Sequence, residues 1–499
     1  MNGGGGELQS FETVLDAAGV CPSIEGLLPS GGRPRQLPVR TLLIGMLLAL
    51  CDHRPAHLTR VHRGLVQLPE ADRWRLRVTV SWKAGPHLLT YRQTERTFAL
   101  VVDALARRSP DGTPSDVLAA VVDAMTEASV PERFKIATSA LAVDWSDMES
   151  FARGPLATGG RSADDEASWG HRRGNGPSQK DEMFFGYYLQ AATMMNEEDG
   201  PPVPELARRI SLTSCRHDPP QVFVPVLERM ARSGVVVGDV LADSGYAHRR
   251  AEHWAVPLRQ IGARLVQDLH PHDRGPRGTY FGAIVSNGNL YCPATPPALL
   301  AIGPLARDAT AEQTHAHDRL TAELARYKLG AITACDDDGY RRVGCPAIQG
   351  KLRCPLRAAS MSLSTDHPEV LSPPESPPAC CCQRTITVAP EVHAKTAQKH
   401  DYPSKTHRQS YARRTGVERT FSTAKDPATN DISRGWCRVM GTTAVTLFVA
   451  CLFVVRNDRV VRSFETRQAE NERRAAAGLP PRTRRRRRRP LADLVSSPP

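Results

Sequence analysis

The segment YARRTGVERTFSTAK, residues 411–425, carries the most informative spacing in the chain and lies in a stretch, residues 408–425, that we predict to be one helix. Four polar residues follow each other at intervals of three, four and seven: Tyr411, Arg414, Glu418 and Lys425. These intervals are close to whole helical turns, so the side chains project from one face. A carboxylate flanked by cations and a phenol can hold a metal ion while its neighbours bind phosphate. The alternative is a plain ion pair between Arg414 and Glu418 on a solvated helix.

Two aspartates each follow an apolar run that predicts a β-strand. Residues 136–143 lead into Asp144, and residues 235–242 lead into Asp243. Adjacent carboxylates repel each other and stay partly protonated unless a divalent cation neutralises them. Mg²⁺ and Mn²⁺ prefer such oxygen ligands, and Glu418 as a third carboxylate would allow a two-metal site.

Two further aspartates compete for these roles. Asp147 could replace Asp144 as the first ligand, but Asp144 directly follows the apolar run and is therefore preferred. Asp239 stands at the start of the second predicted strand, where we expect a capping or turn role.

Strands and helices alternate around these aspartates. Residues 184–193 and 264–269 predict strands, whereas residues 221–233 and 252–261 predict helices. This alternation is typical of an α/β layer, in which polar groups at strand ends form the site. We assign residues 131–270 to the first part of an α/β core.

The regions that flank this core differ from it in composition. Residues 1–130 are predicted to be mostly helical. Residues 271–395 contain seven of the twelve cysteines and many prolines, which indicates an inserted subdomain. Residues 396–464 form the second part of the core with the predicted glutamate helix. Residues 465–499 are polar and basic, and we expect a disordered tail.

The cysteines of the predicted insertion could bind a metal ion. The candidate thiolates are Cys345, Cys354 and two of Cys380, Cys381 and Cys382, with Cys292 and Cys335 as spares. Their spacing lacks the paired C-x2-C that marks a structural Zn²⁺ site, so we expect free thiols, with structural Zn²⁺ as the alternative.

The net charge of +12 is unevenly distributed. Residues 467–493 contain ten arginines and three acids, and residues 484–489 are six consecutive arginines. Such a run neutralises DNA phosphates without reading bases. Residues 439–455 are uncharged but shorter than the roughly 20 residues that span a bilayer, so we expect a buried helix and no membrane partner.

The spacing within residues 411–425 resembles the Y-x2-R-x3-E-x6-K signature of bacterial insertion-sequence transposases of the DDE type, and all four positions match. Residues 241–246, LADSGY, resemble the block around the second aspartate of these enzymes. Residues 143–144 together with residues 149–153, ESFAR, resemble the block around the first. Residues 33–49 more loosely resemble their N-terminal helical region.

The resemblance implies a ribonuclease-H-like core, a mixed sheet flanked by helices, with an insertion before the glutamate helix. The implied catalytic and metal-binding triad, for Mg²⁺ or Mn²⁺, is Asp144, Asp243 and Glu418. The implied DNA contacts near the scissile phosphate are Tyr411, Arg414 and Lys425. Water would attack the phosphate at the element end, and the freed 3′-hydroxyl would then attack target DNA.

The implied partners are transposon terminal repeats and target DNA, with residues 1–130 binding the ends and a homodimer pairing them. No small-molecule substrate is implied. The first 20 residues lack a basic region followed by an apolar run, so we expect a cytoplasmic, nucleoid-associated protein. Two alternatives remain: a transposase-derived DNA-binding protein without strand transfer, and a metal-dependent nuclease on the same core.

Overall fold

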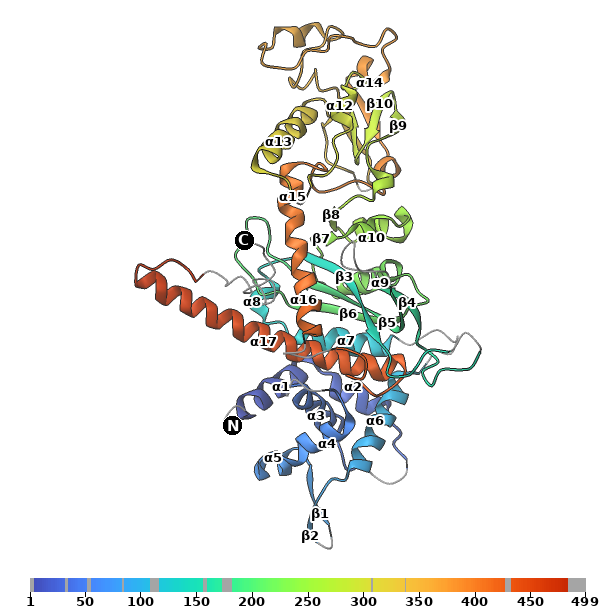
Figure 1. The fold of residues 1–499 in the computed structure, drawn as a ribbon, viewed down its shortest axis with the longest axis vertical. Helices are drawn as coiled ribbons and strands as arrows, with labels where there is room; N and C mark the ends of the chain where they lie inside the picture. The colour runs from blue at the N-terminus through green and yellow to red at the C-terminus, as the bar shows by residue number, and fades with distance from the viewer. Residues whose placement is uncertain are drawn as a thin grey trace, which may run out of the picture.

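The computed structural model describes residues 4–31, 35–51, 55–82, 85–107, 116–155, 159–172, 182–306, 308–336, 338–426 and 432–482. The molecule is elongated, with N-terminal helices at one end, a central sheet, and residues of the predicted insertion at the other end (Figure 1). In the same view, the helical segment over residues 405–425, whose last part contains Glu418, runs from the insertion down to the sheet.

The central sheet has six strands: β3 (Leu141–Glu149), β4 (Ser168–Arg172), β5 (Glu182–Met194), β6 (Ala207–Ser214), β7 (Asp239–Ala242) and β8 (Arg264–Gln267). Its order is β4-β5-β3-β7-β8, and β6 also pairs with β5. The pairs that β5 makes are antiparallel, whereas β3, β7 and β8 run parallel to each other. The predicted α/β class is therefore confirmed as a mixed sheet with helices.

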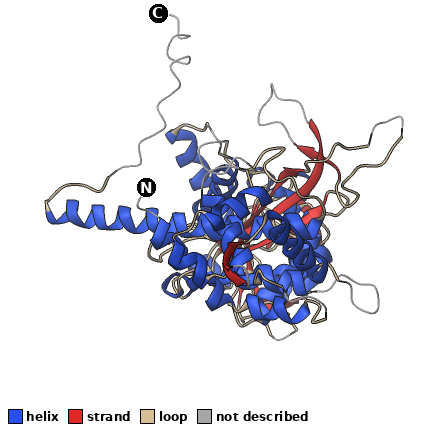
Figure 2. Cartoon of the chain, turned by 90° about the horizontal axis from the view of Figure 1, so that it is seen from below, coloured by secondary structure: helices blue, strands red, loops and turns tan. Residues whose placement is uncertain are grey.

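Helices cover both faces of this sheet. Alternate residues of β3 point to opposite sides: Leu141 and Val143 pack against α9 (Pro219–Arg232) and α11 (Ala255–Gln260), whereas Ala142 faces a second apolar cluster. That second cluster contains α16 (Thr415–Lys425) and α17 (Thr442–Ala476). Figure 2 shows the helices around the strands. The sheet is thus buried between two layers, which fixes the positions of its strand ends.

The N-terminal region shares its core with the sheet. Its elements are α1 (Gly4–Ala18), α2 (Val20–Leu27), α3 (Val39–Cys51), α4 (Leu58–Val66), α5 (Glu70–Arg75), β1 (Thr79–Trp82), β2 (Gly85–Leu88), α6 (Tyr91–Leu105), α7 (Val117–Ala128) and α8 (Glu132–Lys135). Leu42 on α3, Phe98 on α6 and Phe448 on α17 belong to the same apolar cluster as Ala142 of the sheet. Residues 1–130 therefore do not form a separately packed unit within the described ranges.

Helix α17 corrects one expectation about the tail. Its first half is buried around Phe448 and Leu452, so residues 439–455 include a buried helix. In the part of the chain that the structure describes, no helix is long and apolar enough to cross a membrane. The helix continues to Ala476, so the prediction of disorder from residue 465 was wrong for residues 465–476. Helix-favouring residues and an ion pair one turn apart, Arg473 with Glu470 at 3.2 Å, explain this continuation. The six consecutive arginines lie outside the described residues.

Residues between β8 and the glutamate helix form two small cores of their own. They contain two three-stranded sheets, β11-β10-β9 and β12-β13-β14. These elements are β9 (Pro276–Tyr280), β10 (Ala283–Ser286), β11 (Asn289–Tyr291), α12 (Pro297–Leu300), α13 (Ala311–Arg326), β12 (Gly330–Ala331), β13 (Arg341–Gly344), α14 (Ala379–Cys382) and β14 (Thr385–Val388).

Three predicted elements have different bounds in the structure. The first strand begins at Leu141 and includes Asp144, so residues 136–140 are not part of it. The strand predicted from residue 235 begins only at Asp239. The predicted helix over residues 408–425 is divided into α15 (Lys405–Tyr411), a 3-10 turn at Ala412–Arg414 and α16.

Close packing between β3 and β5 generates a testable prediction. A Cβ atom at Gly186 on β5 would lie 2.1 Å from the carbonyl oxygen of Met148 and 2.8 Å from the nitrogen of Ser150. We expect Gly186→Ala to lower the free energy of unfolding by about 3 kcal/mol, because backbone atoms cannot move aside cheaply. Gly64→Ala on α4 is the control: its Cβ meets open space, so it should raise stability by about 0.5–1 kcal/mol. Equal urea midpoints for the two variants would contradict this packing.

Candidate active site

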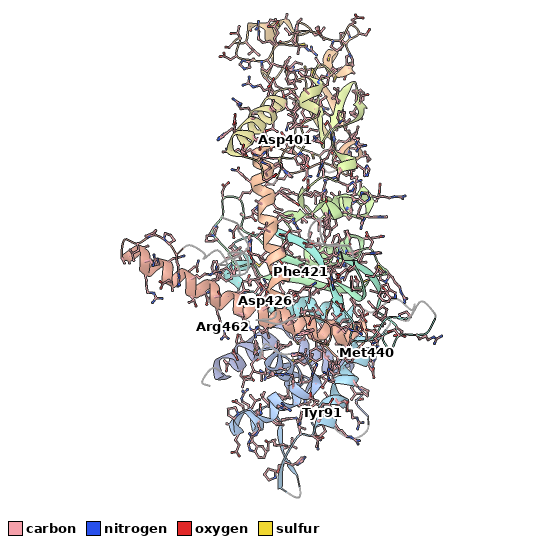
Figure 3. All side chains as sticks on the ribbon, viewed as in Figure 1. Tyr91, Asp401, Phe421, Asp426, Met440 and Arg462 are labelled. Carbon is pink, nitrogen blue, oxygen red and sulfur yellow. The ribbon has the colours of Figure 1, made fainter. Side chains whose placement is uncertain are left out.

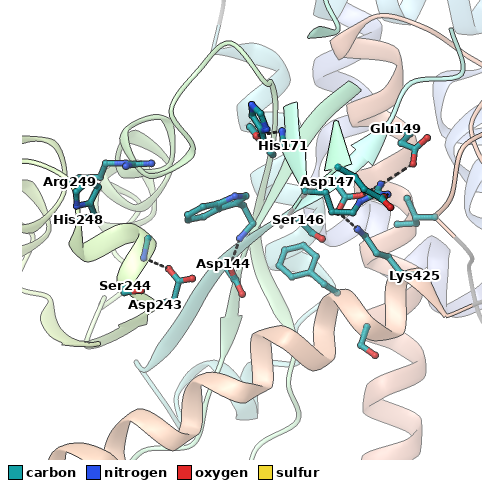
Figure 4. A pocket seen from close by; sticks show the side chains of 18 of the residues that line it. Asp144, Ser146, Asp147, Glu149, His171, Asp243, Ser244, His248, Arg249 and Lys425 are labelled. Carbon is teal, nitrogen blue, oxygen red and sulfur yellow. Dashed lines mark hydrogen bonds and ion pairs between the residues drawn. The ribbon is translucent and has the colours of Figure 1, made fainter. Parts of the chain in front are cut away.

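A cleft of about 1290 Å³ opens between the central sheet and α16 (Figure 4). Its walls come from β3, β4, the segments after β7 and β8, and the end of α16. The lining residues discussed below are Asp144, Trp145, Asp147, Arg172, Asp243, Gly245, His248, Arg249, His270 and Lys425. The cleft is lined by five acidic side chains, Asp144, Asp147, Glu149, Glu182 and Asp243, and by the cations Arg172, Arg249 and Lys425.

The two predicted aspartates lie on neighbouring parallel strands. Leu141 pairs with Val240 and Ala142 with Leu241, and this register, carried two residues further, brings Asp144 level with Asp243. Figure 4 shows the two side chains near each other at the base of the cleft. The structure therefore brings together two segments that are 99 positions apart in the sequence.

Local backbone contacts hold both carboxylates in place. Asp144 Oδ1 accepts a hydrogen bond from the N–H of Trp145 at 2.8 Å. Asp243 is the N-cap of the short helix α10 (Ser244–Ala247), and its Oδ1 accepts from the N–H of Gly245 at 2.9 Å. A Cβ at Gly245 would lie 2.8 Å from the Trp145 ring, so glycine permits the close approach of the two strand ends.

The electrostatic environment of Asp144 is unfavourable to a negative charge. Burial first, and then the neighbouring Asp243, raise the pKa of Asp144 to about 7, although Arg414 acts in the opposite direction. This carboxyl group therefore lacks sufficient positive charge around it, which is the condition that a divalent cation would relieve.

Arg414 connects the aspartates to the glutamate helix. Its Nη1 lies 3.3 Å from Asp144 Oδ2, its Nη2 pairs with Glu418, and its guanidinium carbon lies 5.7 Å from the centre of the Tyr411 ring. Burial alone lowers the pKa of Arg414, but the phenol and the carboxyl groups around it, including Asp243, raise it above its ordinary value. Four of the other five predicted site residues, Tyr411, Asp144, Asp243 and Glu418, thus gather around the guanidinium of Arg414.

Lys425, the sixth predicted residue, lies apart from this group. Its Nζ lies 2.7 Å from Asp147 Oδ1, and Arg172 contacts the other oxygen of Asp147 at 2.5 Å. Burial raises the pKa of Asp147, but these two cations outweigh it and lower that pKa below its ordinary value. Asp147 is already neutralised, so Asp144 is the carboxylate with an unmet need for a cation.

The expected capping or turn role of Asp239 is wrong. Its side chain is fully buried, and Oδ2 accepts from Lys399 and Arg413, both at 2.8 Å. Burial raises the pKa of Asp239, but the hydrogen bonds from these two cations lower it overall. This pairing could not be predicted from the sequence, because Lys399 and Arg413 both follow the predicted insertion.

The donor atoms fit a divalent metal ion, although they are not assembled into a complete site. In the described ranges, no group of three His, Cys, Asp or Glu side chains is arranged to hold a metal ion. The side chain of Glu418 is 51% exposed and turned towards Arg414. Asp144 and Asp243 supply hard carboxylate oxygens that share the charge of Arg414 with Glu418, and Glu418 could join them after separating from Arg414.

Five of the seven cysteines of the insertion lie in its two cores. Cys292, Cys345, Cys354, Cys380 and Cys381 are buried free thiols, whereas Cys335 and Cys382 are exposed. The Sγ atoms of Cys380 and Cys381 lie 4.0 Å apart, and the thiol of Cys382 donates to the carbonyl of Pro377 at 3.1 Å. Structural Zn²⁺ at these thiols stays an untested alternative.

Several cleft residues were missed by the sequence reasoning. His248 and Arg249 follow β7, and His270 follows β8; the rings of His248 and His270 lie 4.1 Å apart. The available signal was their position just beyond the carboxyl ends of parallel strands, where ligand sites form. Trp145 was missed because the strand was predicted to end before Asp144, whereas it continues to Glu149 and includes Trp145.

Comparisons with known proteins add nothing to this description: no family model, no curated protein and no solved structure matches the chain. Its function must be argued from its own residues and geometry.

The contrast between Asp144 and Asp147 generates a prediction. The pKa of Asp144 in the fold, about 7, exceeds its ordinary value of 3.8, so the native state loses stability as pH rises between these values. Asp144→Asn should therefore raise the free energy of unfolding in chelator, by up to about 4 kcal/mol at pH 8 and under about 1 kcal/mol at pH 4. Chemical unfolding at both pH values measures the difference.

Asp147→Asn, three residues away on the same strand, is the matched control. Its carboxylate contributes stability above the unfolded pKa, which is lost as pH falls, so this variant should be less stable than the unchanged protein at pH 8. If Asp144→Asn were also destabilising at pH 8, Arg414 would already compensate Asp144, and the need for a further cation would be disproved.

Proposed function

We propose that this protein is a DDE-type DNA transposase, which cleaves DNA at transposon ends and joins those ends to target DNA in a metal-dependent reaction. The observation that carries the proposal is the arrangement around Arg414. Its guanidinium contacts Asp144 on β3 and Glu418 on α16, and Asp243 is close enough to raise the pKa of Asp144. Three carboxylates from separate elements are thus held around one cation, as the three sequence blocks imply.

The central sheet supports a ribonuclease-H-like assignment. It is mixed, it has helices on both faces, and its antiparallel strands β6, β5 and β3 continue into parallel β7 and β8. The insertion leaves after β8 and returns before α16. This arrangement is compatible with a core that is interrupted before its glutamate helix.

Asp144 and Asp243 are the proposed permanent ligands of Mg²⁺ or Mn²⁺, and Glu418 is the proposed third. Bound divalent cations would neutralise these carboxylates and polarise the reacting phosphate and its attacking oxygen. Glu418 can change partner because its side chain is half exposed and its one described ion pair is with Arg414.

The chain's own side chains would bind and orient the DNA. Arg414 can donate two parallel hydrogen bonds to a phosphate once Glu418 turns away, and the Tyr411 ring supports the guanidinium. Lys425 is paired with Asp147, and Arg172 with Asp147 and Glu149, so these two cations would contact a DNA phosphate by exchanging a carboxylate partner for it. Attack by water, and later by a 3′-hydroxyl, requires no protein nucleophile, so orientation and charge are the protein's contributions.

We further propose a homodimer on paired DNA ends in the cytoplasm at the nucleoid, with residues 1–130 at the terminal repeats. In support, the hairpin of β1 and β2 projects from the end of the molecule farthest from the insertion (Figure 1). A basic tail would add non-specific attraction to DNA.

The proposal predicts that two substitutions abolish cleavage. Asp243→Asn and Glu418→Gln should each lower Mg²⁺-dependent cleavage of a duplex carrying the inverted repeats that bracket the gene by at least about 100-fold. Glu312→Gln, at an exposed position on α13 away from the cleft, should leave the rate unchanged. Rates are measured by gel separation of labelled strands.

The outcomes also distinguish the alternatives. Undiminished cleavage by either triad variant would refute the proposed site. Cleavage without joining of a pre-cleaved end to a target plasmid would identify a metal-dependent nuclease. Sequence-specific binding of the repeats without cleavage would identify a transposase-derived DNA-binding protein.

A further inference from the structure

Arg413 and Arg414 are consecutive residues that reach different strands of the sheet. Both belong to the 3-10 turn that separates α15 from α16. Arg414 reaches Asp144 on β3, as described above, whereas Arg413 reaches Asp239 on β7 at 2.8 Å. The side chain of Arg413 is only 13% exposed. The turn that begins the glutamate helix is therefore attached to both strands that carry the catalytic aspartates.

Arg413 uses its whole guanidinium in this attachment. Nη2 also donates to Ser410 Oγ at 2.7 Å and to Glu198 Oε1 at 3.2 Å. Nη1 donates to the carbonyl of Asn196 at 2.8 Å, and Nε donates to the carbonyl of Ser410 at 3.0 Å. All three nitrogens have partners in fixed positions, which a lysine ammonium at the end of a flexible stem cannot reproduce.

Arg413 belongs to a group of four charged residues that we call the Asp239 clamp: Glu198, Asp239, Lys399 and Arg413. Lys399 Nζ lies 2.8 Å from Asp239 and 2.9 Å from Glu198, so two cations bridge the same two carboxylates. Arg264 lies 2.9 Å from the other oxygen of Asp239, but it comes from β8 and its side chain is 53% exposed. Removing one partner of a buried ion pair leaves an uncompensated charge, so the clamp holds its members firmly.

The clamp acts at a position that matters for the proposed site. Asp239 begins β7, and Asp243 follows immediately after that strand ends, so the distance between them along the sheet is fixed. Arg413 precedes Arg414 by one residue and Glu418 by five. Fixing Arg413 to Asp239 therefore sets both the height and the rotation of α16 relative to Asp243.

We propose that Arg413 is a positioning residue of the active site, which holds the glutamate helix at the height where Glu418 can join Asp144 and Asp243 on a divalent cation. This inference rests on the proposed function. Arg413 would touch neither DNA nor the metal ion. It acts through the placement of Arg414 and Glu418.

The test compares Arg413→Lys with Arg264→Lys, which changes the other arginine at the same carboxylate. Both variants keep the charge, but only Arg413 is connected to the glutamate helix. We expect Arg413→Lys to weaken Mn²⁺ binding, measured by electron paramagnetic resonance without DNA, by about 10-fold or more. The kcat for cleavage should fall to a similar extent while KM for DNA changes less than about twofold. Arg264→Lys should leave Mn²⁺ binding and kcat unchanged.

Ser410→Ala provides a milder variant if Arg413→Lys does not fold. It removes the hydroxyl that contacts both Arg413 and Glu198, and it should weaken Mn²⁺ binding in the same direction, by about threefold. Thermal unfolding of each variant is recorded alongside.

Equal Mn²⁺ affinity and kcat in Arg413→Lys and Arg264→Lys, despite a loss of thermal stability in the former, would reduce Arg413 to a structural role and overturn the inference. If the unchanged protein neither bound Mn²⁺ nor cleaved DNA, the proposed function itself would fail, which is a different result.

Discussion

Repulsion between Asp144 and Asp243 is the constraint on which the rest of the site depends. The parallel pairing of β3 with β7 brings both carboxylates to one level, and burial between two layers of helices removes water that would screen them. Among the described residues, the guanidinium of Arg414 pairs with Asp144, and Glu418 pairs with the same guanidinium. One positive charge among three carboxylates leaves an excess of negative charge, which a divalent cation would neutralise in the proposed site.

Other acids near the cleft have a lowered pKa because cations pair with them. The comparison with Asp144 explains why only some acids would be available for the proposed chemistry. Asp147 has Arg172 and Lys425, and Asp239 has Lys399 and Arg413, so both have a lowered pKa in spite of burial. These two acids are used for holding β3, β7 and α16 together. The residues that hold the framework are fully paired, whereas Asp144, three positions from Asp147 on the same strand, is not.

The sequence predicted the α/β class, four of the six strands of the central sheet and the candidate acids, because these depend on local patterns, but it missed β4 and β6. Apolar runs that end at Asp144 and Asp243, and helical spacing through Glu418, are visible without a fold. It offered the Arg414–Glu418 ion pair as an alternative, and this pair is present, but it could not predict the partners of the aspartates. Residues 413 and 414 are both arginines, so residue type does not show which of them faces Asp144. Their orientation depends on a 3-10 turn that interrupts the predicted helix. The role of Asp239 depends on Lys399, which is 160 positions away.

The chain that leads from the insertion into that turn is held by both the insertion and the sheet. The returning chain runs beside β8: the N–H of Lys399 donates to the carbonyl of Leu265 at 2.9 Å, and Gln398 exchanges two hydrogen bonds with the backbone of Gln267, each at 2.8 Å. Helix α15 then pairs with the insertion, since Arg408 contacts Asp318 of α13 at 2.5 Å. Asp401, at the base of the insertion in Figure 3, pairs with Lys328. Helix α15 therefore contacts both the insertion and β8, where His407 Nε2 lies 3.1 Å from the carbonyl oxygen of Gln267, whereas α16 packs into the core of the sheet through Phe421. The helical path continues through the 3-10 turn Ala412–Arg414 (Figure 1), and the two arginines of that turn attach it to β7 and to β3, beside the two aspartates.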